Sequence, residues 1–181
     1  KAVTNIKTDI DGIVKFKEMR VLENEETGEK TVVSQSAKII IKTHEFEIPS
    51  GAILLVEEGQ TVKNGEVLVE FDPYHIPIIT EKDGRVEYRE LYVKENLDIK
   101  YGVTERMAVK PMETGDISPR IIIFDNSNNK VAEYSIPYGS YLMVQEGSEV
   151  RKGDILAKIL KEGEGNKDIT GGLPRVQELF E

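Results

Sequence analysis

The sequence predicts an all-β fold in which two small antiparallel barrel or sandwich domains follow one another and a short C-terminal helix ends the chain. Three observations lead to this prediction. A block of 26 residues occurs twice, apolar and polar residues alternate over short runs, and these runs are bounded by Gly, Pro, Asn or Asp. The length of 181 residues suits one large domain or two small ones.

The repeated block covers residues 46–71 and 134–159. The two copies align without a gap and carry the same residue at 10 of 26 positions. The second copy is longer overall, and we expect its extra residues in the loop Lys110–Pro119. Each copy is predicted to be one structural unit, because further matches lie upstream in the same order. These are Asp11–Glu18 with Asp83–Glu90, and Ile39–Ile41 with Ile121–Ile123.

The repeat divides the chain into three parts. We expect a first domain over residues 1–80, a second over residues 81–162, and a linker with the start of a helix over residues 163–181. The stretch Ile78–Val93 fits either the end of the first domain or the beginning of the second.

Turn residues inside the repeat predict its local geometry. Gly59 and Gly147 stand in tight turns, where glycine adopts a positive φ without strain. The pair Asn64-Gly65 predicts a β-hairpin turn. Between the turns, Val62 and Val150 are expected to point into the core.

The predicted helix lies at the end of the chain. Thr170 or Gly172 is a suitable N-cap, and Pro174 fits the first turn. The spacing places three apolar residues on one helical face: Leu173, Val176 and Phe180. A linker is expected before the helix, at Gly163–Asn166.

Composition excludes several function classes. The chain has 24 Lys and Arg against 33 Asp and Glu, a net charge of −9, which argues against autonomous nucleic-acid binding. The absence of Cys excludes disulfides, thiolate nucleophiles, iron–sulfur clusters and cysteine zinc sites. Without a long apolar run or a signal peptide, we expect a soluble intracellular protein with no membrane contact. Because position 1 is Lys, we expect a piece of a longer protein.

Candidate catalytic and metal residues are scarce. His44 and His75 are the only histidines, and neither belongs to a spacing that places two imidazoles on one helical face. We therefore expect no catalytic, cofactor-binding or metal-binding residue in this chain.

One alternative is a carrier of a covalently bound prosthetic group. The spaced glycines and valines resemble those of biotinyl and lipoyl domains, which present a modified Lys on a hairpin. The corresponding hairpin here is predicted at Phe71–Pro77 and contains no Lys. Lys110 lies outside it, so the carrier interpretation is the remote one.

Two strings in the chain carry a resemblance to a known family. Asp168–Glu181 resembles the C-terminal arm of the trigger loop of the bacterial DNA-directed RNA polymerase β′ subunit. Phe71-Asp72-Pro73, followed by Ile76–Glu81, resembles the large insertion that some lineages carry in that loop. Such insertions are tandem sandwich-barrel hybrid motifs, which agrees with the repeat.

The resemblance implies a site at the end of the chain rather than a reactive centre. It assigns the trigger-loop arm and its hinge to Thr170, Gly171, Gly172, Leu173, Pro174, Arg175 and Val176. Gly171-Gly172 permits a change of backbone direction before the helix. Arg175 is interpreted as an exposed side chain that balances Glu178, with pairing to acidic neighbours in the whole enzyme as the alternative.

The resemblance further implies a role within a larger enzyme. The chain would be part of a cytoplasmic nucleotidyltransferase, with the rest of β′, other polymerase subunits and transcription factors as partners. The Mg and Zn sites of the subunit lie outside this fragment, which is expected to be inactive alone. We expect it to modulate trigger-loop opening and closing during nucleotide addition, pausing and elongation. The alternative is a docking module for another polymerase subunit or a transcription factor, with a contact patch that includes Tyr74, Tyr138 or Tyr141.

Overall fold

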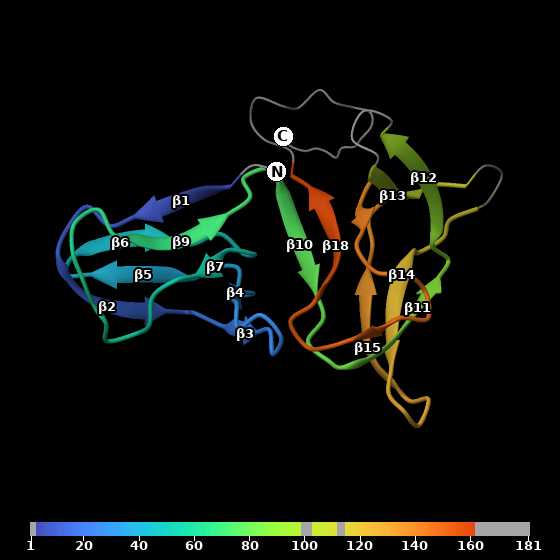
Figure 1. Cartoon of the computed structure of the whole chain (residues 1–181), viewed down its shortest axis with the longest axis horizontal. Helices are drawn as coiled ribbons and strands as arrows, with labels where there is room; N and C mark the ends of the chain where they lie inside the picture. Colours follow the sequence, from blue (N-terminus) through green and yellow to red (C-terminus); the bar gives the residue numbers. More distant parts are fainter. Residues whose placement is uncertain (1–2, 99–102, 112–114, 162–181) are drawn as a thin grey trace. The chain divides into compact units, whose positions relative to one another are not determined.

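The computed structural model describes residues 3–98, 103–111 and 115–161. The chain divides into two compact units, a first unit of residues Lys1–Pro73 and a second unit of residues Tyr74–Glu181 (Figure 1). The described residues form four antiparallel sheets and contain no helix, which confirms the all-β prediction. The predicted C-terminal helix and the linker before it fall within residues 162–181, outside the described residues.

The described part of the first unit contains nine strands. They are β1 (Thr4–Lys7), β2 (Gly12–Lys17), β3 (Val21–Glu23), β4 (Lys30–Val32), β5 (Lys38–Ile41), β6 (His44–Glu47), β7 (Ile53–Leu54), β8 (Thr61–Val62) and β9 (Val67–Phe71). One sheet has the order β1-β9-β7-β4-β3 and the other has the order β6-β5-β2-β8.

The described part of the second unit also contains nine strands. They are β10 (His75–Ile79), β11 (Gly84–Arg89), β12 (Tyr92–Asp98), β13 (Val103–Val109), β14 (Arg120–Phe124), β15 (Lys130–Ser135), β16 (Tyr141–Leu142), β17 (Glu149–Val150) and β18 (Ile155–Leu160). Its sheet orders are β10-β18-β16-β13-β12 and β15-β14-β11-β17. Because these orders match those of the first unit strand for strand, the sequence repeat is a repeat of topology.

The boundary between the units differs from the expected one. β10 pairs with β18 through His75↔Leu160 and its neighbours, so it belongs to the second unit. In the same way β1 pairs with β9 through Thr4↔Phe71. The boundary expected after residue 80 therefore lies between Pro73 and Tyr74, because the segment that follows Pro73 forms its backbone hydrogen bonds with the last described strand of the second unit.

Each unit has its own aliphatic core, to which strands of both of its sheets contribute. The largest fully buried side chains of the first core include Val14, Val32, Ile39, Ile41, Val62, Leu68 and Val69. Those of the second core include Val86, Ile121, Ile123, Ile136 and Leu156. Alternation along β5 and β14 places the two outer isoleucines of each triplet in these cores. They are Ile39 and Ile41 in the first unit and Ile121 and Ile123 in the second.

The turns of the repeat confirm most of the local predictions. Gly59 and Gly147 have φ values of 90° and 88°, and Val62 and Val150 are buried. Asn64-Gly65 forms a turn, closed by the Glu66 amide donating to the Lys63 carbonyl at 2.9 Å. The hairpin prediction is wrong, however, because the turn joins β8 to β9 and these strands belong to different sheets.

The extra residues of the second unit are not confined to Lys110–Pro119. The hairpin β12–β13 has seven residues in each strand, whereas β3–β4 has three. The β14–β15 connection is also longer, since Ile123 pairs with Ala132 where its counterpart Ile41 pairs with His44. Length was added at several connections, which leaves the sheet orders unchanged.

A buried threonine fixes the same turn in both units. The hydroxyl of Thr8 donates to the Ile10 carbonyl at 2.6 Å and accepts from the Ile10 amide at 3.1 Å. Thr80 makes the same two bonds with Lys82, at 2.7 Å and 3.1 Å. Both threonines are almost completely buried, so each hydroxyl satisfies backbone groups that the sheet leaves unpaired.

Candidate docking site

A hollow of about 400 Å³ opens on the first unit beside β4. We call it the β4 hollow. Its floor is apolar, with Leu54 and Val56 buried, and its rim is charged. The lining residues are Phe16, Val21, Glu23, Lys30, Leu54, Val56, Glu57 and Glu58.

The charges around the β4 hollow are unevenly paired. The Lys30 ammonium lies 3.5 Å from a carboxylate oxygen of Glu57, and Glu58 accepts a hydrogen bond from the Phe16 amide at 3.0 Å. Glu23 faces Lys30 across the β3–β4 pair, yet it forms no ion pair with any residue that the structure describes. The hollow therefore carries an excess of negative charge with an uncompensated carboxylate.

The second unit fills the equivalent place with its own side chains. Glu95 faces Arg106 across β12–β13, as Glu23 faces Lys30, and the two charged groups lie 3.6 Å apart. The guanidinium of Arg106 donates to the Val144 carbonyl at 3.1 Å and to the Tyr88 hydroxyl at 2.9 Å. Its central carbon lies 5.8 Å from the centre of the Tyr88 ring, a cation–π distance.

Tyr88 contributes to this arrangement through its hydroxyl as well as its ring. Its hydroxyl donates to the Val144 carbonyl at 2.5 Å. Burial raises the pKa of Tyr88, and the hydrogen bond from Arg106 opposes that rise. Glu146 accepts from the Tyr88 amide at 3.2 Å, as Glu58 accepts from Phe16. The Val144 carbonyl therefore receives two donors, one from a guanidinium and one from a phenol.

Three residue differences explain why one site is open and the other filled. The repeat alignment pairs Glu57 with Gln145. Glu57 attracts Lys30, whereas the neutral Gln145 does not compete with Glu95 for Arg106. Lys30 stands where the second unit has Arg106, and an ammonium lacks the planar fork of donors. Phe16 stands where the second unit has Tyr88, so the hydroxyl donor is missing.

The Val56 carbonyl shows the consequence of these differences. Val56 is only 3% exposed and is the counterpart of Val144 in the repeat. Within the described part of the chain, nothing donates a hydrogen bond to its oxygen. A buried carbonyl without a donor is unusual in a folded protein, so the first unit has an acceptor that its own side chains do not satisfy.

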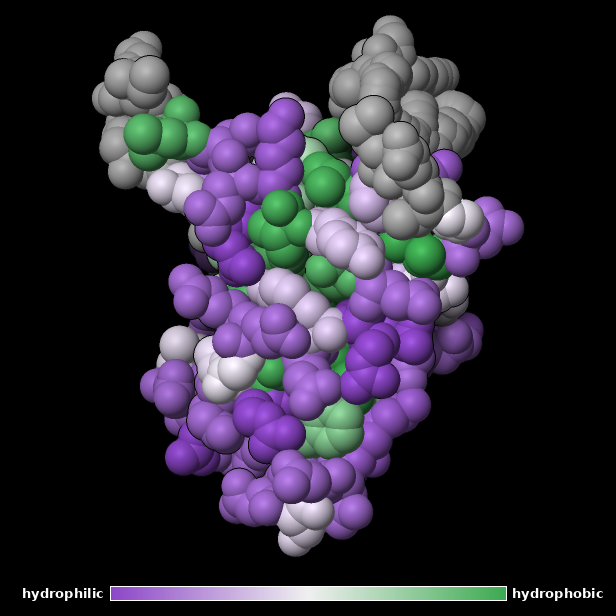
Figure 2. Space-filling model, turned by 90° about the vertical axis from the view of Figure 1, so that its right-hand side faces the viewer, coloured by the Kyte–Doolittle hydropathy of each residue, from purple (hydrophilic) through white to green (hydrophobic). Residues whose placement is uncertain are grey.

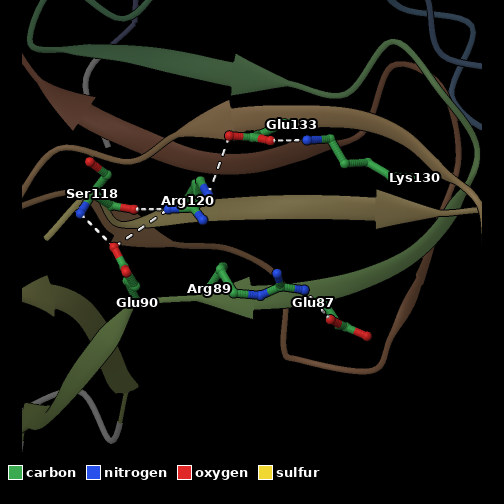
Figure 3. A network of polar contacts seen from close by, with 7 residues as sticks. All are labelled: Glu87, Arg89, Glu90, Ser118, Arg120, Lys130 and Glu133. Carbon is green, nitrogen blue, oxygen red and sulfur yellow. Dashed lines mark hydrogen bonds and ion pairs between the residues drawn. The ribbon is translucent and has the colours of Figure 1, made fainter.

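A separate network of charges covers one face of the second unit on β11, β14 and β15 (Figure 3). Arg120 lies 3.5 Å from Glu90 and 3.3 Å from Glu133. Glu90 accepts from the Ser118 amide at 2.8 Å, which fastens the loop before β14. Lys130 also pairs with Glu133, and its hydrogen bond lowers the pKa of Glu133. The network is exposed and mutually neutralised, which indicates a structural surface.

The trigger-loop residues predicted from the sequence are not among the described residues. Thr170, Gly171, Gly172, Leu173, Pro174, Arg175 and Val176 all lie within residues 162–181. Tyr74 and Tyr138, proposed as docking residues, are 56% and 41% exposed. Tyr141 is half-buried in β16 against the ring of His75, with ring centres 6.0 Å apart, and burial raises its pKa.

The two histidines lie in different units. His44 Nδ1 is 2.8 Å from a carboxylate oxygen of Asp9, while His75 packs against Tyr141. Residues 3–98, 103–111 and 115–161 hold no group of three or more His, Cys, Asp or Glu side chains placed to bind a metal ion. They also contain no helix of the length and apolar character needed to span a membrane.

The segment Phe71–Pro77, compared above with a carrier hairpin, is not a hairpin. β9 ends at Phe71 and pairs with β1 and β7, whereas β10 begins at His75 and pairs with β18. The segment is the connection between the two units, because its flanking strands find partners in different units.

The surface visible in Figure 2 is largely hydrophilic, with smaller hydrophobic areas between charged and polar residues. This agrees with the 31% of charged residues in the sequence.

Sequence reasoning missed the residues of the β4 hollow and of its filled counterpart. Lys30 and Arg106 lie outside the aligned blocks, in hairpins of different length, so no residue-to-residue match connects them. The available signals were the Phe16/Tyr88 and Glu57/Gln145 differences inside the aligned blocks. These differences indicate a site only once the fold shows that the residues lie near β4 in the first unit and near β13 in the second.

Comparison with known proteins shows that the chain is similar to one part of much longer proteins. It is 54% identical to DNA-directed RNA polymerase subunit beta' of Fusobacterium nucleatum, over 179 residues and 99% of its length. Proteins of the same name from Orientia tsutsugamushi and Ehrlichia chaffeensis are 38% and 35% identical, over 95% and 98% of the chain. The chain spans only 13% to 14% of the length of these curated relatives.

No family model matches the chain. Its similarity to the relatives nevertheless extends across both β units and the residues that follow them, because each alignment covers 95% or more of the sequence. Over almost its entire length, the chain is thus homologous to one segment of bacterial DNA-directed RNA polymerase β′ subunits.

Proposed function

We propose that the chain is a segment of a DNA-directed RNA polymerase β′ subunit and serves DNA-templated transcription as a non-catalytic module. The observation that carries this proposal is the 54% identity to a β′ subunit over 99% of the chain. Nucleotidyl transfer would belong to the whole subunit, assembled with the other polymerase subunits in the bacterial cytoplasm.

The proposed role is to bias the movement of the trigger loop. This rests on the resemblance of Asp168–Glu181 to the C-terminal arm of that loop. A module attached to the loop shifts its equilibrium only if it contacts its surroundings differently in the open and closed states. A difference of ~1.4 kcal/mol is enough for a tenfold change in the populations. The two buried aliphatic cores support this role, because well-packed units deform little under load.

The experiment is a deletion in an intact RNA polymerase whose β′ subunit contains this chain. Residues 3–161 are replaced by a short Gly-Ser linker, and single-round transcription is followed at each template position. We expect RNA synthesis to continue with altered pausing or elongation rate. Unchanged kinetics at every position would exclude the biasing role.

A matched pair of smaller deletions tests whether both units contribute. One variant lacks residues 3–73 and the other lacks residues 74–161, so each removes all the described strands of one unit. If one deletion reproduces the full effect and the other has none, the bias arises from contacts of the unit whose removal reproduces the effect.

A further inference from the structure

The second unit shows how this fold holds a guanidinium. Arg106 lies over the Tyr88 ring, donates to the Val144 carbonyl and pairs with Glu95. Its side chain is only 19% exposed. The site therefore combines an aromatic ring, a backbone acceptor and a carboxylate around one arginine.

The first unit presents the same three elements without the arginine. Phe16 supplies the ring, Val56 the backbone acceptor and Glu23 the carboxylate, and all three line the β4 hollow. Lys30 does not take the arginine's place, because it pairs with Glu57 instead. Neither the Val56 carbonyl nor the Glu23 carboxylate has a hydrogen-bond donor or cation among the described residues.

We propose that the β4 hollow binds an arginine side chain presented by a partner protein. The guanidinium would donate to the Val56 carbonyl, pair with Glu23 and lie over the Phe16 ring. This inference goes beyond the proposed function, because it names the chemistry of a partner and depends only on residues of the first unit.

Charge and geometry both favour this occupant. Three carboxylates and one paired ammonium surround the hollow, so the rim attracts a cation and repels the phosphates of a nucleic acid. A guanidinium donates in several directions of one plane, whereas an ammonium is a compact and more strongly hydrated charge. Arginine therefore matches a carbonyl, a carboxylate and a ring at one site better than lysine does.

The test uses the complete 181-residue chain, labelled with ¹⁵N, and the peptide acetyl-Gly-Arg-Gly-amide as the probe. The matched control peptide contains citrulline, which keeps the shape of arginine and removes its charge. We expect the arginine peptide to shift the amide signals of Phe16, Val21 and Glu58 in a saturable way. The citrulline peptide should bind at least tenfold more weakly.

A closed variant reproduces the second unit within the first. It carries Phe16→Tyr, Lys30→Arg and Glu57→Gln, which should let residue 30 fill the hollow from inside. We expect a loss of peptide affinity of at least tenfold, while the exposed control substitution Lys63→Arg keeps the affinity of the natural chain. If the closed variant does not fold, the single change Glu23→Gln should still weaken binding at least threefold.

Three results would overturn the proposal. These are no saturable shifts at the lining residues, equal binding of the citrulline peptide, or unchanged affinity in a folded closed variant or in Glu23→Gln. None of them bears on the transcription experiment, because no polymerase activity is measured.

Discussion

The guanidinium of Arg106 is held against Tyr88, 2.9 Å from its hydroxyl and 5.8 Å from the centre of its ring. Both side chains also donate to the same carbonyl, that of Val144. The residue that occupies the corresponding position in the first unit, Lys30, makes only an exposed ion pair with Glu57. One position in a repeated fold thus has a structural role in one copy and leaves a hollow in the other.

Replacing Arg106 should therefore cost more than replacing Lys30. In Arg106→Ala, the Val144 carbonyl and the Tyr88 hydroxyl each lose a donor, which should reduce the free energy of unfolding by roughly 1–3 kcal/mol. In Lys30→Ala only a surface pair is lost, worth about 0–1 kcal/mol. Denaturant unfolding of the two variants measures the difference. Equal losses would show that Arg106 is as peripheral as Lys30.

The Glu133 carboxyl should titrate below its ordinary pKa of 4.5, because Lys130 donates to it and Arg120 lies nearby. A carboxyl with a lowered folded-state pKa stabilises the fold above its unfolded-state pKa, and this stabilisation is lost as pH falls through the folded-state value. NMR titration of the Glu133 side chain measures the midpoint directly. Lys130→Met should raise it, whereas Lys94→Met, on the other sheet, should leave it unchanged. A midpoint insensitive to Lys130→Met would contradict the assigned cause.

Gly84 should not tolerate a side chain. Its φ is 155°, and a Cβ atom would lie 2.4 Å from the Phe124 carbonyl oxygen and 2.7 Å from Ile123 Cγ2. Relief requires movement of the β14 backbone, so Gly84→Ala should lower the free energy of unfolding by roughly 1–3 kcal/mol. Gly115→Ala, where a Cβ meets no atom within 4 Å, is the control and should stay within about 0.5 kcal/mol. Thermal melts that do not separate the two variants would refute the steric argument.

Thr80 and Thr8 should respond alike to the loss of their hydroxyls. Valine keeps the shape of threonine but leaves the amide and carbonyl of Lys82, or of Ile10, without their partner. Each change should cost roughly 1–3 kcal/mol. Thr104→Val, at an exposed position of β13, should change stability by about 0.5 kcal/mol or less. If Thr80→Val is as mild as Thr104→Val, the buried hydroxyl is not required for the turn.

The parts of the fold that local chemistry dictates were predictable from the sequence. The core positions of the outer isoleucines in each triplet and of the buried valines follow from alternation. Gly59 and Gly147 follow from the positive φ that their turns require. The repeat itself identified two units, since identical turn residues recur in the same order.

The parts that depend on distant partners were not predictable. Tyr74–Ile79 begins the second unit because of its pairing with β18, and alternation within a strand does not say which strand lies beside it. Asn64-Gly65 makes a turn as expected, but the change of sheet between β8 and β9 depends on long-range packing. The β4 hollow likewise requires Glu57, Lys30 and Phe16 to meet, although they are distant in sequence.

In both units the opening strand lies directly beside the closing one, as Thr4↔Phe71 and His75↔Leu160 show. The polypeptide therefore enters and leaves each unit at neighbouring points, separated by about one strand spacing of ~4.8 Å. If such a unit is inserted into a loop of another protein, the two residues that flank the insertion point stay close together. Gain or loss of either unit during evolution would thus leave the backbone path of the surrounding polypeptide nearly unchanged.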